Sequence, residues 1–154
     1  NRKGKSLLAP IEINKLFEKN MRKNNWISKE KHYLVTSDPA TNDILKEENL
    51  PTQASIVKKK NIDAYPSSNT TNFIKENVSV NLQLGKYTFV HFDIYNHISN
   101  YFNNEIKLVI IIVPTKKMSS KMSSGPTFYE KNLHEIQRCK GNYPGIPMIL
   151  GGIE

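Results

Sequence analysis

The sequence predicts an α/β fold in which helices alternate with the strands of a covered sheet. From Val78 to the end of the chain, the hydrophobic pattern runs in the order strand, helix, strand, helix, strand. Helical connections between strands favour parallel neighbours and a sheet with helices on its faces. The 154 residues are enough for one domain with a real core, and no internal repeat or second domain stands out. We therefore expect a single domain over residues 1–154.

The first of these strands is predicted at residues 78–84, where apolar and polar side chains alternate. Val78 and every second residue after it are apolar, so that they share one face of a strand. The residues between them, which include Asn81 and Gln83, share the other face. Valine favours a pleated, half-buried surface, which supports the same interpretation.

The elements after this strand follow from their hydrophobic periods. Five apolar residues between 88 and 102 recur at steps of three or four and predict an amphipathic helix: Phe89, Phe92, Tyr95, Ile98 and Phe102. Such a face is more often part of the core, which is the role we expect, but this helix and the N-terminal helix are also candidate dimer elements. Residues 108–113 are continuously apolar and end at a proline, as in a central strand covered on both faces. A helix over 128–138 and a short strand over 148–150 complete the pattern.

The first half of the chain is less regular. Residues 1–6 are expected to form a basic tail, followed by a helix that begins at Pro10, because proline is tolerated in a first helical turn. A short strand is predicted at 31–36. Residues 38–70, rich in Pro, Ser, Asn, Thr and Lys, are expected to form a long exposed connection with at most a short polar helix at 41–49.

Composition points to a polyanionic partner. The chain has 22 Lys and Arg against 14 Asp and Glu, which gives a formal net charge of +8. Such a balance favours nucleic acid, although a merely soluble basic protein has the same signature. The longest apolar run has six residues, far short of the roughly 20 that cross a membrane. The single Cys139 excludes an internal disulfide and fits a reducing cytoplasm.

The pattern with chemical content is a set of three amides. Asn72 is followed nine residues later by Asn81, and Gln83 lies on the same strand face as Asn81. With Asp at 72 and Glu at 81, this would be the signature of a divalent-metal nuclease, because Mg²⁺ in proteins prefers carboxylates together with water and substrate phosphate. His91 and Asp93 resemble a paired site in sequence, but positions two apart on a helix do not face each other.

The same residues carry a resemblance to a known family. Residues 80–89, Val-Asn-Leu-Gln-Leu-Gly-Lys-Tyr-Thr-Phe, resemble the Val-Glu-Val-Gln-Phe-x-x-Tyr-x-Phe segment of type II restriction endonucleases of the BglII/BstYI kind. Asn72 matches the position of their first acidic residue at the same interval. The likeness continues through residues 107–118, 122–125, 128–130 and 147–153, includes the leading helix at 6–26, and is loose only between 38 and 68.

The resemblance implies a PD-(D/E)xK nuclease fold, which is a restriction-endonuclease-like three-layer sandwich around a mixed sheet. It also implies Mg²⁺-dependent homodimers in the bacterial cytoplasm that cut palindromic duplex DNA, mostly at sites built around GATC. Position by position, Asn72 and Asn81 take the places of the metal-binding Asp and Glu, and Gln83 that of a lysine for which the BglII branch accepts Gln. A two-fold dimer matches a palindromic site.

A basic, serine-rich loop over residues 116–126 is the candidate for contacts with the DNA backbone. Phosphate contacts of this kind fix the register of a protein on DNA without reading its sequence. The candidate residues are Lys116, Lys117, Ser119, Lys121, Ser123 and Ser124.

The two asparagines leave three interpretations open. The chain is an engineered inactive variant, which we favour, or a natural pseudonuclease that binds DNA or a partner, or the alignment is shifted and Glu76 or Asp63 supplies the acid. In the first two cases the loss of two anions weakens Mg²⁺ binding severely.

Overall fold

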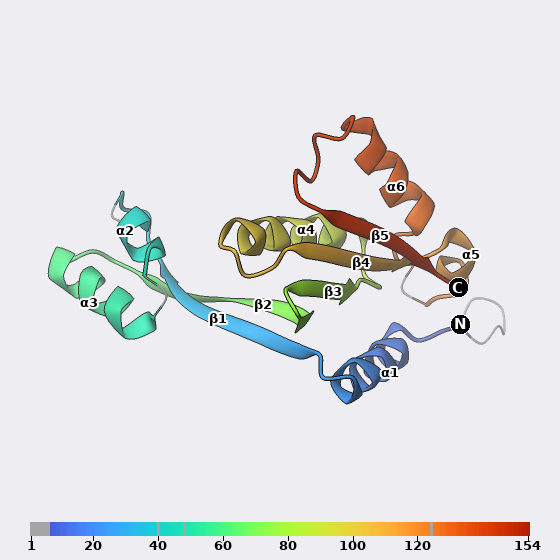
Figure 1. Cartoon of the computed structure of the whole chain (residues 1–154), viewed down its shortest axis with the longest axis horizontal. Helices are drawn as coiled ribbons and strands as arrows, with labels where there is room; N and C mark the ends of the chain where they lie inside the picture. Colours follow the sequence, from blue (N-terminus) through green and yellow to red (C-terminus); the bar gives the residue numbers. More distant parts are fainter. Residues whose placement is uncertain (1–6, 40, 48, 124) are drawn as a thin grey trace. The chain divides into compact units, whose positions relative to one another are not determined.

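The structure, a computed structural model, confirms the mixed α/β fold class (Figure 1). It describes residues 7–39, 41–47, 49–123 and 125–154, without the side chain of Asn72. The expected basic tail and Ser124 lie outside these residues. In chain order the elements are α1 (Pro10–Lys23), β1 (Ile27–Val35), α2 (Thr41–Leu45), α3 (Leu50–Lys60), β2 (Tyr65–Lys75), β3 (Val78–Leu82), α4 (Tyr87–Phe102), β4 (Leu108–Pro114), α5 (Lys116–Ser119), α6 (Tyr129–Arg138) and β5 (Met148–Ile153).

The five described strands follow one another across the sheet in sequence order, from β1 to β5. β2 and β3 form an antiparallel hairpin, whereas β3, β4 and β5 run parallel. The parallel part is the one that the sequence predicts, because α4 and α6 return the chain to the same end of the sheet each time. A mixed sheet therefore results from one hairpin joined to two helical crossovers.

The register of the parallel strands decides which side chains face which helices. Asn81 of β3 lies beside Ile111 of β4, and Ile111 lies beside Leu150 of β5. Neighbouring residues of paired strands point to the same face of a sheet. Ile111 belongs to the larger core cluster, which includes Val90 and Ile94 of α4. Asn81 therefore points to the face that α4 covers.

The opposite face has a smaller core. Leu84, just after β3, packs with Met118 of α5 and Met122, and Ile13 of α1 joins them. The alternation predicted for residues 78–84 is thus correct, but both faces are covered, and the polar residues of β3 are buried rather than half-exposed. This burial sets the chemistry of the candidate site.

The inward face predicted for α4 is wrong. Four of the five aromatic or apolar residues assigned to it are 53–70% exposed: Phe89, Phe92, Tyr95 and Phe102. The helix instead buries Val90, Ile94, His97 and Asn100 against the sheet. Both sets recur at helical spacing, so periodicity alone does not choose between them. Packing against the sheet selects the set that contains compact β-branched residues, together with polar groups that can pair with those of β3.

Residues 38–70 form more structure than the expected connection. They contain α2, α3 and the first part of β2, and Lys29–Thr70 is one of two compact units in the chain, the other being Asn1–Ser28 with Thr71–Glu154. The start of α3 was not predicted. There the side chain of Asn49 accepts a hydrogen bond from the N–H of Thr52, and a proline lies in the first turn. Both are ordinary helix-start features.

The two units differ in charge. Residues 29–70 contain six lysines and six acidic residues, so the formal net charge of +8 lies entirely in the rest of the chain. None of the helices in the described part of the chain has the length and apolar character needed to cross a bilayer.

Candidate functional site

Polar residues of β3 lie buried beneath α4. Ser79 has no exposed surface and Asn81 is 7% exposed, and both point to the α4 face of the sheet. Buried polar groups of this kind need hydrogen-bond partners, because unpaired ones cost free energy when removed from water. Those partners must come from the covering helix or from the neighbouring strand.

The covering helix supplies a matching stripe of polar residues. Asp93, His97 and Asn100 follow one another at steps of four and three, so they lie on one face of α4. The Asn100 Nδ2 atom donates to Oγ1 of Thr71 in β2 at 2.6 Å, and both residues are buried. The interface between α4 and the sheet is therefore a polar seam set within an apolar core.

Asp93 accepts hydrogen bonds from two of the three amides singled out in the sequence. The Nε2 atom of Gln83 donates to Oδ2 of Asp93 at 2.5 Å. The side chain of Asn81 is also hydrogen-bonded to this carboxylate. Burial raises the pKa of the Asp93 carboxyl, and the bonds from Gln83 and Asn81 oppose that rise. The structure thus brings Asn81 and Gln83 together around a carboxylate.

The orientation of Gln83 is set by the backbone that follows it. The N–H of Gly85 donates to Oε1 of Gln83 at 2.8 Å, which turns the NH₂ group toward Asp93. A Cβ atom at position 85 would lie 2.7 Å from that oxygen, too close for the present arrangement. Glycine at this position therefore allows Gln83 to fold back on its own strand.

Asn72 lies in β2, beside β3. The described pairs of this hairpin end at Ile74 with Ser79, and Asn72 and Asn81 are each two residues beyond that pair. Phe73, between Asn72 and Ile74, has a φ of 46°, a left-handed conformation that interrupts the regular hydrogen-bonding pattern of the two strands. Glu76, an alternative source of the acid, lies exposed in the turn between β2 and β3, at the opposite end of β3 from Asn81. Asp63, the other alternative, lies in the second unit.

The candidate DNA-contacting loop contains the short helix α5 and is partly committed to internal contacts. Lys116 places its Nζ atom 4.3 Å from the centre of the Phe128 ring, and Lys117 pairs with Glu154 at 2.8 Å. Ser119 is buried, and its hydroxyl donates to the carbonyl of Pro126. Of the candidate residues, those with exposed side chains are Lys116, Lys117, Lys121 and Ser123.

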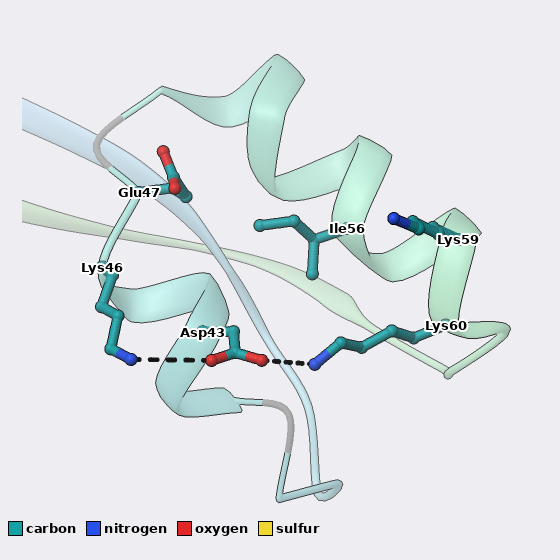
Figure 2. Close-up of a pocket in the computed structure, with 6 residues that line it drawn as sticks. All are labelled: Asp43, Lys46, Glu47, Ile56, Lys59 and Lys60. Atoms are coloured by element: carbon teal, nitrogen blue, oxygen red, sulfur yellow. Dashed lines mark hydrogen bonds and ion pairs between the residues drawn. The ribbon is translucent and has the colours of Figure 1, made fainter.

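A separate hollow of about 460 Å³ lies within the second unit, lined by Asp43, Lys46, Glu47, Ile56, Lys59 and Lys60. Figure 2 shows Asp43 of α2 between Lys46 and Lys60. Its hydrogen bond and attraction to Lys60 lower the pKa of Asp43. Because this carboxylate already neutralises two of the three lysines, the hollow joins α2 to α3 and does not form a strong anion site.

Comparison with protein families decides the relationship of the chain. The family described as restriction endonuclease BglII/BglIII matches residues 1–153. The chain belongs to this restriction endonuclease family. No curated protein sequence matches it. The match covers both units and every element of the sheet. DNA is the substrate class that membership of this restriction endonuclease family implies.

The donor set present at the centre does not fit a tightly held divalent cation. Among the described residues, no three His, Cys, Asp or Glu side chains come close enough to bind a metal ion together. Asp93 supplies one anion, and the oxygen of Gln83 already accepts a hydrogen bond from Gly85. Mg²⁺ sites in proteins generally need one or two carboxylates with freely available oxygens. We therefore derive no catalytic step through a metal in this chain.

Asp93 is the residue of this centre that the sequence argument missed. His91 and Asp93 do not form a pair, because they lie two residues apart on one helix. The strand that Asp93 faces cannot be inferred from that spacing. Asp93 is the sole formally charged residue within α4, and it stands at helical spacing from His97 and Asn100. A polar stripe on a helix that follows a strand with a polar face is a signal that two elements share a polar interface.

His97 makes the stability of this seam dependent on pH. It is 3% exposed, burial lowers its pKa to about 4, and its Nδ1 atom has no hydrogen-bond partner among the described residues. An unfolded chain takes up the proton near pH 6.5, so between pH 6.5 and 4 the unfolded state binds more protons than the folded one. We expect the free energy of unfolding to fall over this range, by at most about 3 kcal/mol from His97.

Urea denaturation at pH 7, 5.5 and 4.5 measures this dependence. His97→Gln should flatten the decline toward low pH, whereas His134→Gln, at an exposed position of α6, should leave it unchanged. An identical decline in the wild-type chain and in His97→Gln would contradict the assignment.

Proposed function

We propose that this chain is a catalytically disabled type II restriction endonuclease of the PD-(D/E)xK superfamily, which binds double-stranded DNA at a palindromic, GATC-containing site in the bacterial cytoplasm. The observation that carries this proposal is the centre itself. Asn81 and Gln83, which by resemblance to the family take the places of a metal-binding Glu and of a lysine, converge on one carboxylate, Asp93. The residues that would hold the ion in an active form are Asp at 72 and Glu at 81, with Gln83 beside them.

A natural pseudonuclease that serves as a DNA- or partner-binding module is the alternative. The hydrogen bond between the Asn81 side chain and Asp93 is compatible with it, because the acid has neutral partners in this chain. Both versions share the same expected behaviour of this chain: DNA binding without cutting.

Cleavage of duplex DNA tests the disabled centre. In buffer with Mg²⁺, we expect no cutting by this chain or by either single variant, Asn72→Asp or Asn81→Glu, and cutting of GATC-containing duplexes by the double variant. Each carboxylate contributes part of the charge that holds the ion and stabilises its hydroxide. The measurement is gel analysis of an end-labelled duplex, with EDTA as the control. Cutting by the unmodified chain would refute the disabled state, and an inactive double variant would refute the assignment of positions 72 and 81.

The charge distribution supports a DNA interface on the unit that contains the centre. That unit holds the entire net charge of +8, and it includes the surface lysines of the 116–126 loop. Lysines that contact phosphates release counterions, which makes binding weaken steeply as salt rises. We propose Lys116, Lys117 and Lys121 as such contacts, together with the sequence-predicted candidates Ser123 and Ser124.

Binding measured against salt concentration tests this interface. Changing Lys116, Lys117 and Lys121 together to Ala should reduce the slope of log K against log salt by about 2 to 3 per bound chain, since each lost phosphate contact removes about 0.9. The matched control changes Lys58, Lys59 and Lys60, three lysines of the neutral unit, one of which already pairs with Asp43. Fluorescence anisotropy in EDTA provides the measurement. An equal or larger effect of the control triple would move the interface to α3, and a flat response in the wild-type chain would argue against DNA binding.

We further propose that the chain forms a homodimer through the exposed aromatic face of α4. Phe89, Phe92, Tyr95 and Phe102 lie on the surface of this helix, and its one formally charged residue, Asp93, faces the sheet. Two copies that each carry +8 repel one another, so they approach most easily through a face without lysines. DNA needs cations, which this face lacks. A second copy of the chain is therefore the occupant that the chemistry favours, and a two-fold contact pairs the face with itself.

Analytical ultracentrifugation tests the dimer. The wild-type chain should sediment with the mass of two copies, and Phe92→Asp with Tyr95→Asp should sediment as one folded copy with an unchanged circular dichroism spectrum, because both side chains are on the surface. Tyr65→Asp is the control, since Tyr65 is 64% exposed and belongs to the other unit. A monomeric wild-type chain at micromolar concentration, or a dimer that survives both charges, would refute this interface.

A further inference from the structure

The Asp93 carboxylate has an unusual set of partners for a charged group beneath a helix. The contacts that the structure describes for it both come from amides, Gln83 and Asn81. A carboxylate removed from water usually pairs with a cation or accepts several hydrogen bonds. Here amides take that role: Gln83 directs its NH₂ group at the acid, and the side chain of Asn81 is hydrogen-bonded to it as well.

The amide of Gln83 is held in this orientation independently of Asp93. Its oxygen accepts the Gly85 N–H, and position 85 tolerates no Cβ without a shift of that oxygen. Its NH₂ group is therefore directed at the carboxylate by the backbone. Asn81, at 7% exposure, is buried next to it on the same strand face. The pocket around the acid is thus built from donors that are already in place before any ligand arrives.

We propose that in this chain the Asn81 and Gln83 amides replace a divalent cation as the partner of Asp93, and that Asp93 becomes a cation ligand as soon as residue 81 carries a carboxylate. A carboxylate at 81 no longer donates a hydrogen bond and places a second anion against Asp93. The two like charges then repel each other at short range in a partly buried site. A divalent cation between them relieves that repulsion and satisfies oxygens of both.

This inference concerns the same centre as the proposed function, on which it rests for the identity of the cation position. It assigns to Asp93 a positioning role here and a ligand role in the restored site. Its test needs neither DNA nor cleavage, so a failure of DNA binding and a failure of this inference are separate results.

An exchange of acid and amide between positions 81 and 93 provides the test. Asn81→Asp changes no side-chain size, but it puts two carboxylates in contact. Asp93→Asn in the same chain restores one acid and one amide in the reverse order, so that Asn at 93 donates to Asp at 81. Melting temperatures are measured by circular dichroism at pH 7.5, with MgCl₂ or with NaCl of matched ionic strength.

We expect Asn81→Asp to melt at least about 3 °C below the wild-type chain in NaCl, an ordinary shift for the loss of a buried contact in a chain of this size. Mg²⁺ should recover most of that loss. The exchanged double variant should melt within about 2 °C of the wild-type chain in NaCl and should gain nothing from Mg²⁺. The wild-type chain should also show no gain from Mg²⁺.

Two results would overturn the inference. One is a melting temperature of Asn81→Asp equal to that of the wild-type chain in both salts. The other is an equal gain from Mg²⁺ in Asn81→Asp and in the exchanged variant, which would place the ion away from Asp93. Should Asn81→Asp fail to fold in NaCl, recovery of the fold by Asp93→Asn supports the inference, and an exchanged variant that also fails to fold contradicts it.

Discussion

The candidate site depends on one constraint: a carboxylate on the sheet-facing side of a helix needs hydrogen-bond donors from the adjacent strand. Asp93 projects from α4 toward β3, and the amides of Gln83 and Asn81 meet it there. Partial burial raises the pKa of the Asp93 carboxyl, and the hydrogen bonds from the two amides oppose that rise. The position and rotation of α4 therefore have to satisfy this acid as well as the core.

The same constraint explains how α4 is held against β3. Gln83 and Asn81 place amide donors against Asp93 of α4, so that the helix and the strand are joined by hydrogen bonds as well as by apolar packing. Asn100 and Thr71 extend the seam by a direct hydrogen bond between α4 and β2. Hydrogen bonds from neutral groups therefore satisfy polar atoms of the interface between α4 and the sheet.

Basic and aromatic surfaces lie on different elements of the same unit. Lysines of the 116–126 segment lie on the surface, whereas the outer face of α4 presents aromatic rings and no lysine or arginine. Positive charge attracts DNA and repels a second copy of the same chain, whereas aromatic residues are enriched where proteins meet one another. This chain places the two kinds of surface on different elements.

Local patterns predicted much of this fold. The alternation of residues 78–84, the apolar run at 108–113 and the proline at position 10 each determine one element through short-range rules. They failed where two interpretations were locally equal. Phe89, Phe92 and Tyr95 have the same helical spacing as Val90, Ile94 and His97, and only the sheet decides which set is buried. The helix α3 was missed because a composition rich in Pro, Ser and Lys concealed an asparagine cap.

By itself, the sequence determined the alternation of strands and longer helices from β3 to β5, the basic character of the chain, and the presence of three amides at positions 72, 81 and 83. It also determined that Asn81 and Gln83 share one face of a strand, because the side-chain period of a strand is two. The tertiary structure alone decided that this face is covered by α4 and that Asp93 meets the amides there. The reason is that contact between residues of two elements depends on how the helix rotates over the sheet, and that rotation is set by packing and by buried charge, not by any local pattern.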